Sequence, residues 1–141
     1  MSWCDRAHHD MLVDVHDFPQ YPMSRNTDLG RLGEDLACQY LQGLGFLLRG
    51  RNIRIGTHDE IDILAFDPED RVLVFVEVKT RSRSDEYFRP EMNIDYRKTK
   101  ALRRAARRWV ADHAFEGGYR IDVVSVADGK VVGHIQELAC E

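Results

Sequence analysis

Apolar residues recur along the chain with two different periods, and each period predicts one kind of element. Helical spacing runs from Thr27 to Gly43, with Thr27 or Asp28 as the expected N-cap, and Gly45 follows the helix. The apolar positions of this helix are Leu29, Leu32, Leu36, Ala37, Tyr40, Leu41 and Leu44. A second helix is expected over residues 96–113, ending near Gly117 and Gly118.

The other periodic segments predict five strands, over residues 46–55, 59–66, 72–80, 119–126 and 130–138. A "DPED" turn containing Pro68 joins the second strand to the third, and Asp128-Gly129, a strong hairpin signal, joins the last two. The predicted fold is therefore α/β, with about five strands and helices in the order αβββαββ. Residues 1–24 lack a sustained period and predict an extension, which leaves a single domain over residues 25–141.

Charged residues interrupt the second and third strands, which are the most apolar ones. Side chains alternate across a strand, so residues two apart share a face. In the third strand one face holds only valines, and the other passes from apolar to charged residues: Leu73, Phe75, Glu77, Lys79 and Arg81. In the second strand Ile61, Ile63 and Ala65 are expected on one face. The opposite face should hold Glu60, Asp62 and Leu64.

If these two strands pair as a hairpin, their charged ends meet, because both ends lie far from the turn. Asp62 and Glu77 then approach each other, and two close carboxylates repel unless a cation compensates. Mg²⁺ or Mn²⁺ suits this role, since hard divalent cations prefer oxygen ligands. Lys79 is placed to neutralise the site, orient the attacking water or stabilise charge on a phosphate. The alternative is a structural charge cluster at a solvated sheet edge, which the Glu-x-Lys spacing alone does not exclude.

The order of elements and the placing of these residues resemble the PD-(D/E)XK nuclease superfamily. Its core is a helix, three strands, a helix and a further strand, with Asp on the second strand and Glu-x-Lys on the third. The resemblance implies a restriction-endonuclease-like core, with a mixed central β-sheet of about five strands flanked by helices. More closely, the chain resembles the YraN-like family of small, poorly characterised bacterial predicted endonucleases. The matching segments are "GRLGEDLACQYLQGLGF", "RN", "EIDILAFD", "VFVEVKTR", Lys100 with the Ala-rich helix after it, and "YRIDVVSV". They span about Gly30 to Ile135 and are far more specific together than any one motif.

This resemblance implies that Asp62 and Glu77 bind metal and that Lys79 is the catalytic lysine. It also implies that Glu34, in "GRLGE", is a further metal-site acid, which the first helix points toward the site. A helix-start acid favoured by the macrodipole is the alternative for Glu34. The two glycines of "GRLGE" cost helix propensity, so close packing or substrate approach is expected to explain them.

Two further acids have supporting roles in the resemblance. Glu60 corresponds to the acid of the family's Gly-Glu-Ile-Asp motif, in which Asp59 here replaces the glycine. Asp122 corresponds to the family's final Arg-x-Asp position, two residues after Arg120. We expect a structural pairing of Arg120 with Asp122 rather than a catalytic role.

The second predicted helix begins with "RKTKALRRAARR", residues 97–108, which holds seven basic residues and no acid. Its basic residues at helical spacing are Lys100, Arg103, Arg104, Arg107 and Arg108. A second stripe is apolar and consists of Leu102, Ala105, Ala106, Trp109 and Val110. The basic stripe, together with Arg81, predicts a surface for nucleic-acid phosphates, and a merely solubilising surface is the alternative.

Composition agrees with a folded domain, with 43% hydrophobic and 31% charged residues among 141. No apolar run approaches the roughly 20 residues of a bilayer span, and the N-terminus lacks a signal-peptide pattern, so a cytoplasmic protein without membrane contact is expected. The three cysteines lack disulfide or zinc spacing, which favours free thiols. The net charge of −4 is concentrated before residue 25 and does not exclude an anionic partner.

A basic surface beside a carboxylate site is what metal-dependent phosphodiester hydrolysis needs. The sequence therefore predicts a Mg²⁺- or Mn²⁺-dependent nuclease acting on DNA, directed by the structure of its substrate rather than by base sequence. The alternative is a non-cleaving nucleic-acid-binding module in a DNA repair, recombination or uptake assembly. An interaction domain with surface charge clusters is a third reading, which predicts no metal site. DNA or RNA as the substrate, and a monomer or a homodimer, stay open.

Overall fold

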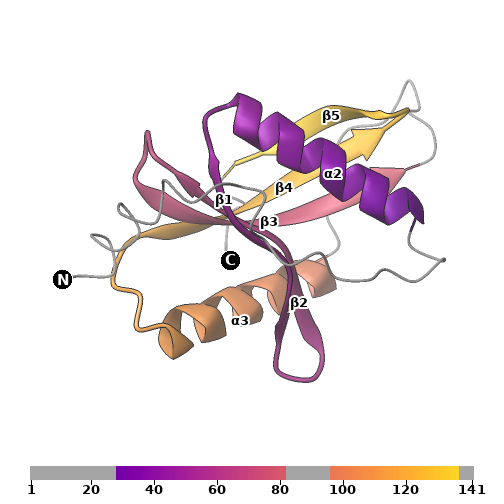
Figure 1. Cartoon of the computed structure of the whole chain (residues 1–141). Coiled ribbons are helices and arrows are strands. Elements are labelled where there is room, and N and C mark those ends of the chain that lie inside the picture. The colour runs from indigo at the N-terminus through magenta and orange to yellow at the C-terminus, as the bar shows by residue number, and fades with distance from the viewer. Residues whose placement is uncertain (1–27, 82–95, 137–141) are drawn as a thin grey trace.

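The computed structural model describes residues 28–81 and 96–136, which form a five-stranded sheet with one helix on each face (Figure 1). The elements are α2 (Asp28–Gly43), β1 (Leu47–Ile55), β2 (Asp59–Asp67), β3 (Val72–Arg81), α3 (Tyr96–Asp112), β4 (Tyr119–Ala127) and β5 (Lys130–Ile135). The predicted order αβββαββ is confirmed, and its boundaries agree closely with those expected. The extension predicted over residues 1–24 lies outside the described residues.

The strands lie in the order β1-β2-β3-β4-β5. The pairs β1·β2, β2·β3 and β4·β5 are antiparallel, and β3·β4 is parallel. A parallel neighbour requires a crossover connection, and α3 lies within the segment that connects β3 to β4. The sheet is therefore mixed, as the sequence predicts.

Both helices end with the same hydrogen-bond pattern, although a glycine is present at only one of the two ends. After α2 the Phe46 amide donates to the Leu41 carbonyl at 3.0 Å, with Gly45 at φ 93° in the left-handed region. After α3 the Phe115 amide donates to the Val110 carbonyl at 3.0 Å, with Ala114 at φ 48°. The second helix therefore ends before Gly117 and Gly118, because the left-handed position falls on an alanine.

The sheet separates two apolar cores, one under each helix. The faces predicted for the third strand are confirmed, since Val74 and Val76 pack on the α2 side while Leu73 and Phe75 pack on the α3 side. The expectation for Ile61 is wrong. Ile63 and Ala65 lie in the α2-side core, whereas Ile61 lies in the α3-side core. Strict alternation fails at the intervening Asp62, where the pairing of β2 with β3 has ended.

Two leucines assigned to the apolar stripe of α2 are half exposed, Leu32 at 52% and Leu44 at 50%. Gly33, the next residue, is the one that faces β3 of the sheet. Leu32 therefore points to one side of the contact between α2 and the sheet. Leu44 lies beyond the last residue of the helix. The apolar stripe of α3 is confirmed, because Leu102, Ala105, Ala106 and Trp109 are buried and Val110 packs against them. Within the described residues, neither helix has the length and apolar character needed to cross a bilayer.

Candidate active site

The site forms where β2 and β3 separate. Their ladder extends from Asp67↔Val72 to Ile63↔Val76, and the same register places Asp62 opposite Glu77 just beyond its last pair. The Val78 amide donates to Asp62 Oδ2 at 2.9 Å. A side chain thus accepts a bond from the backbone of the neighbouring strand where the ladder stops. The predicted meeting of the two charged strand ends follows from this register.

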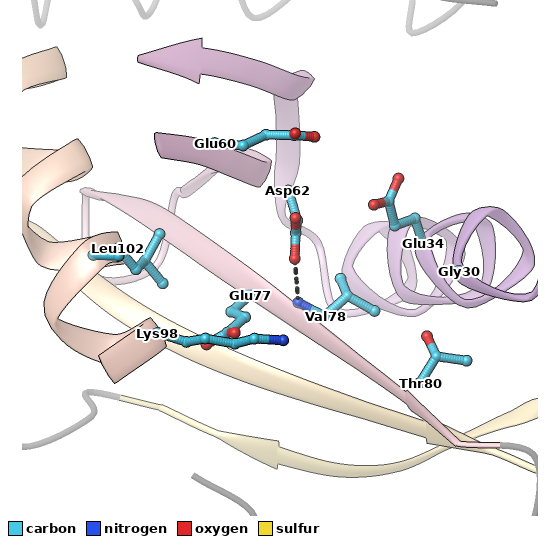
Figure 2. A pocket seen from close by; sticks show the side chains of 10 residues that line it. Gly30, Glu34, Glu60, Asp62, Glu77, Val78, Thr80, Lys98 and Leu102 are labelled. Carbon is cyan, nitrogen blue, oxygen red and sulfur yellow. Dashed lines mark hydrogen bonds between the residues drawn. The ribbon is translucent and has the colours of Figure 1, made fainter. Parts of the chain in front are cut away.

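A cleft of about 330 Å³ opens at this point, between the N-terminal halves of α2 and α3 (Figure 2). Its lining comprises Gly30, Glu34, Glu60, Asp62, Glu77, Val78, Thr80, Lys98, Ala101 and Leu102. We call it the acidic cleft, because four carboxylates and one ammonium group line it. The fold therefore gathers four acids that the sequence singled out, from α2, β2 and β3.

The surroundings of Asp62 strongly perturb its carboxyl group. Burial raises the pKa of Asp62 from 3.8 to about 7, although the hydrogen bond from the Val78 amide opposes this rise. The negative charges of Glu34, Glu77 and Glu60 raise it further. Near neutral pH this side chain is therefore held between its protonated and ionised forms, and a nearby cation would favour the ionised form.

Glu34 reaches the cleft from α2, and its side chain is 14% exposed. Burial raises the pKa of Glu34, while a hydrogen bond that Glu34 accepts from the Asn52 side chain and the charge of Arg51 oppose the rise. Arg51 Nη2 lies 3.4 Å from Glu34 Oε2, and Arg51 Nη1 lies 2.7 Å from Asp35 Oδ1. Two adjacent residues of β1 therefore contact Glu34 and hold it beside the cleft.

The glycines of "GRLGE" have different surroundings. A Cβ on Gly33 would overlap Thr80 Oγ1, so this glycine allows α2 to approach the end of β3. Gly30 lines the cleft, and a Cβ there would meet nothing within 4 Å. Close packing explains Gly33, and Gly30 keeps the α2 side of the cleft open.

Two lysines lie at or near the cleft, and the sequence singled out one of them. Lys79 Nζ lies 4.0 Å from Glu77 Oε1, but Lys79 is not among the lining residues. Lys98, from the first turn of α3, lines the cleft, and in Figure 2 its side chain extends across the cleft beside Glu77. A signal for Lys98 was present. It precedes Leu102 by four positions, which places a basic residue on the apolar stripe of the helix.

The side chains provide oxygen donors suited to a hard cation. In the parts of the chain described here, no three His, Cys, Asp or Glu side chains are close enough to hold a metal ion together. Mg²⁺ usually takes one or two carboxylates together with waters and substrate phosphates. Asp62 and Glu77, opposite each other on separating strands, fit this smaller ligand set, and Glu34 lines the same cleft.

The basic stripe predicted on α3 is divided by its ion pairs. Lys100 and Arg107 are exposed, and Arg103 is half-buried. Arg104 donates to both carboxylate oxygens of Asp59, at 2.8 and 2.7 Å. Asp59, which stands where the family's motif has glycine, thus binds α3 to the start of β2. Arg108 Nε lies 3.9 Å from Asp112 Oδ2, and Arg81 is exposed at the end of β3.

Asp122 lies in a separate group of charged side chains, on β4, outside the residues that line the cleft. It is fully buried, with Arg120 Nε at 3.0 Å from Oδ1 and His134 Nε2 at 2.8 Å from Oδ2. Arg120 also pairs with Asp67 at 3.0 Å and with Asp70 at 2.9 Å. We call this group the Arg120 cluster. The expected pairing of Arg120 with Asp122 is present.

The αβββαββ order and the mixed five-stranded sheet define a restriction-endonuclease-like core. The model of the uncharacterised protein family UPF0102 matches residues 33–126, and the chain belongs to this family. A UPF0102 protein of Streptomyces coelicolor is 43% identical over 106 residues, which cover 74% of this chain and 79% of that protein. A UPF0102 protein of Mycobacterium tuberculosis is 41% identical over 114 residues, covering 79% and 88%. These relatives are consistent with the YraN-like resemblance of the sequence.

Proposed function

We propose that this protein is a metal-dependent nuclease that hydrolyses DNA phosphodiester bonds in the cytoplasm. The observation that carries the proposal is the position of Asp62 opposite Glu77, just beyond the last pair of two separating strands, in a cleft with two further acids and a lysine. Mutually repelling carboxylates cost folding free energy. A site that keeps them together is most economically explained by a cation that binds there.

In this proposal each side chain of the acidic cleft has a separate role. Asp62 and Glu77 hold Mg²⁺ or Mn²⁺, and Glu34 assists from α2. A cation held there would supply charge neutralisation at the scissile phosphate and would make a nearby water more acidic. Lys79, beside Glu77, and Lys98, in the cleft wall, orient the attacking water or stabilise the negative charge that develops on the phosphate. Basic residues of α3 hold the nucleic-acid backbone through contacts that carry little base-sequence information.

The first experiment is calorimetric titration of Mn²⁺ and Mg²⁺ into the wild type and into the Asp62→Asn/Glu77→Gln double variant. We expect the wild type to bind and the double variant to lose binding. Glu116→Gln, which removes an exposed acid outside the cleft lining, serves as the charge control and should bind as the wild type does. Equal binding by the wild type and the double variant would contradict the assignment of the metal site.

The second experiment measures cleavage and binding separately. Glu77→Gln should abolish cleavage of branched, flapped and single-stranded DNA but retain or strengthen DNA binding, because it removes a negative charge that opposes the phosphate. Gel-based cleavage and fluorescence polarisation would report the two effects. Equal cleavage by the wild type and Glu77→Gln would refute the catalytic role.

A non-cleaving nucleic-acid-binding module is the second candidate function. It is favoured by the observation that, among residues 28–81 and 96–136, no three potential ligands are already gathered for a metal ion. This alternative predicts DNA binding by the wild type without cleavage in Mg²⁺ or Mn²⁺. It also predicts that the Asp62→Asn/Glu77→Gln variant binds DNA with a salt dependence close to that of the wild type.

A further inference from the structure

A second pocket lies along α3, and the proposed chemistry of the acidic cleft does not use it. Its volume is about 480 Å³, and its wall combines residues of β1 and β2 with the C-terminal half of α3. Three arginines line it, Arg49 and Arg54 from β1 and Arg108 from α3. We call it the arginine pocket. Among the described residues that line this pocket, Asp112 is the one acid, so the three arginines leave an excess of positive charge.

The pocket suits a phosphate group that belongs to a long, solvated ligand. Guanidinium groups bind phosphate oxygens through paired, directed hydrogen bonds, and here they come from two different elements. Arg54, Arg108 and His113 are exposed, so the pocket is an open depression and not an enclosed chamber for a small molecule. Asp112 competes only weakly with a phosphate for Arg108, because the two side chains are 3.9 Å apart and each is more than half exposed.

Local backbone and ring contacts shape this depression. Gly56 has φ 65°, and a Cβ there would lie 2.8 Å from Arg108 Nη1, so a larger residue would displace the guanidinium. Trp109 stacks on His113 with ring centroids 4.0 Å apart and an interplanar angle of 15°. The His113 Nδ1 lies 2.8 Å from the Trp109 carbonyl oxygen, which fixes the imidazole against the helix. The floor and one side of the pocket are thereby held in place.

The two pockets lie on the same face of α3. The α3 residues that line the acidic cleft are Lys98, Ala101 and Leu102. The residues eleven positions further on, Trp109, Asp112 and His113, line the arginine pocket. Eleven residues are close to three helical turns, so the pockets share one face and are about 16 Å apart along the axis. This separation is roughly five base-pair steps of duplex DNA, which rises about 3.4 Å per step.

We propose that the arginine pocket binds a backbone phosphate of duplex DNA, on the flank of the segment whose scissile phosphate lies in the acidic cleft. The inference rests on the proposed function in taking DNA as the ligand. The pocket fixes the position and direction of the duplex along α3, and the cleft acts on it at a distance set by the helix. The pocket contacts no reacting atom, so its residues contribute to binding and not to the chemical step.

The test compares Arg54→Gln/Arg108→Gln with Arg71→Gln/Lys130→Gln. Both double variants remove two positive charges, and the control residues are exposed and line neither pocket. Binding of a fluorescein-labelled 20-base-pair duplex would be measured in EDTA over a series of salt concentrations. We expect the pocket variant to bind roughly 10-fold more weakly and its salt slope to fall by about 1 for each phosphate that it no longer neutralises. The control should stay close to the wild type.

Cleavage kinetics separate this inference from the proposed function. If the wild type cleaves, the pocket variant should raise KM and leave kcat unchanged. A wild type that cleaves, with equal salt slopes for both double variants, would overturn the pocket and leave the nuclease intact. Duplex binding that depends on the pocket, without cleavage in Mg²⁺ or Mn²⁺, would support the pocket and overturn the nuclease. Circular-dichroism melting would verify that both variants are folded.

Discussion

The acidic cleft and the Arg120 cluster both hold buried or half-buried acids on the inner strands of one sheet, yet their surroundings differ. In the Arg120 cluster, Asp122 contacts Arg120 and His134, so its negative charge meets donors supplied by the protein. In the acidic cleft, burial and then the charges of the neighbouring carboxylates raise the pKa of Asp62 to about 7. The Arg120 cluster therefore compensates its buried charge within the folded chain. The acidic cleft leaves an electrostatic cost to the folded state, which a bound cation can remove.

The largest expected effect comes from breaking the Arg120 cluster. Asp122→Asn should lower the free energy of unfolding by about 3–5 kcal/mol, because it removes a fully buried carboxylate that contacts both Arg120 and His134, and a single amide oxygen cannot accept from both. Urea denaturation followed by circular dichroism would measure the loss. The matched change in the cleft, Glu77→Gln, should alter stability by less than about 1 kcal/mol. Equal losses for both variants would remove the distinction between the two groups.

A somewhat smaller effect of opposite sign is expected for Asp62→Asn. Above pH 7, in metal-free buffer, the variant should be more stable than the wild type by about 2–4 kcal/mol, because the wild type must keep a buried carboxyl ionised. Between about pH 7 and pH 4 the folded wild type retains a proton that the unfolded chain has released, so the advantage should shrink as pH falls. Below about pH 4 both states of the wild type are protonated, and the advantage should vanish.

Thermal melts at pH 8, 6 and 4 would test this pH dependence. Adding Mg²⁺ or Mn²⁺ at pH 8 should stabilise the wild type and leave Asp62→Asn unchanged, since only the ion-binding folded state gains free energy. An advantage that stays constant across the three pH values would show that it comes from packing and not from the charge of Asp62.

The smallest effect is expected where α2 meets β3. Gly33→Ala should cost about 1–3 kcal/mol, because its methyl group would overlap the Thr80 side chain. It should also weaken metal binding, since Glu34 is the next residue. Gly30→Ala is the control in the same helix. It has open space around it and should be neutral or gain up to about 1 kcal/mol. Equal losses for both alanines would contradict a steric contact specific to Gly33.

The sequence predicted those parts of the site that follow from strand periodicity. The face of β3 that carries Glu77 and the pairing that brings Asp62 opposite it both follow from alternation and from the position of the turn. Lys98 was missed because its contribution depends on where the start of α3 lies relative to the end of β3, which periodicity does not specify. Ile61 was misplaced for a related reason, since alternation presumes an unbroken ladder.

The arginine pocket shows the same limit at longer range. Arg49, Arg54 and Arg108 were each visible as basic residues, but β1 and α3 are more than forty positions apart in the chain. Only the tertiary packing of α3 against β1 and β2 places them around one depression. The direction of a side chain within one element could be predicted from the sequence. The packing of one element against another could not.

The position of the Arg120 cluster also bears on the mechanics of the β2–β3 hairpin. Asp67 and Asp70, at its turn, are bound through Arg120 to β4, whereas the strands have separated at Asp62 and Glu77. Beyond that point β2 stays paired with β1, and β3 stays paired with β4. Each carboxylate is therefore carried by its own pair of strands, and the Val78–Asp62 hydrogen bond links the two pairs. A change in the spacing of Asp62 and Glu77 has to move one pair of strands relative to the other.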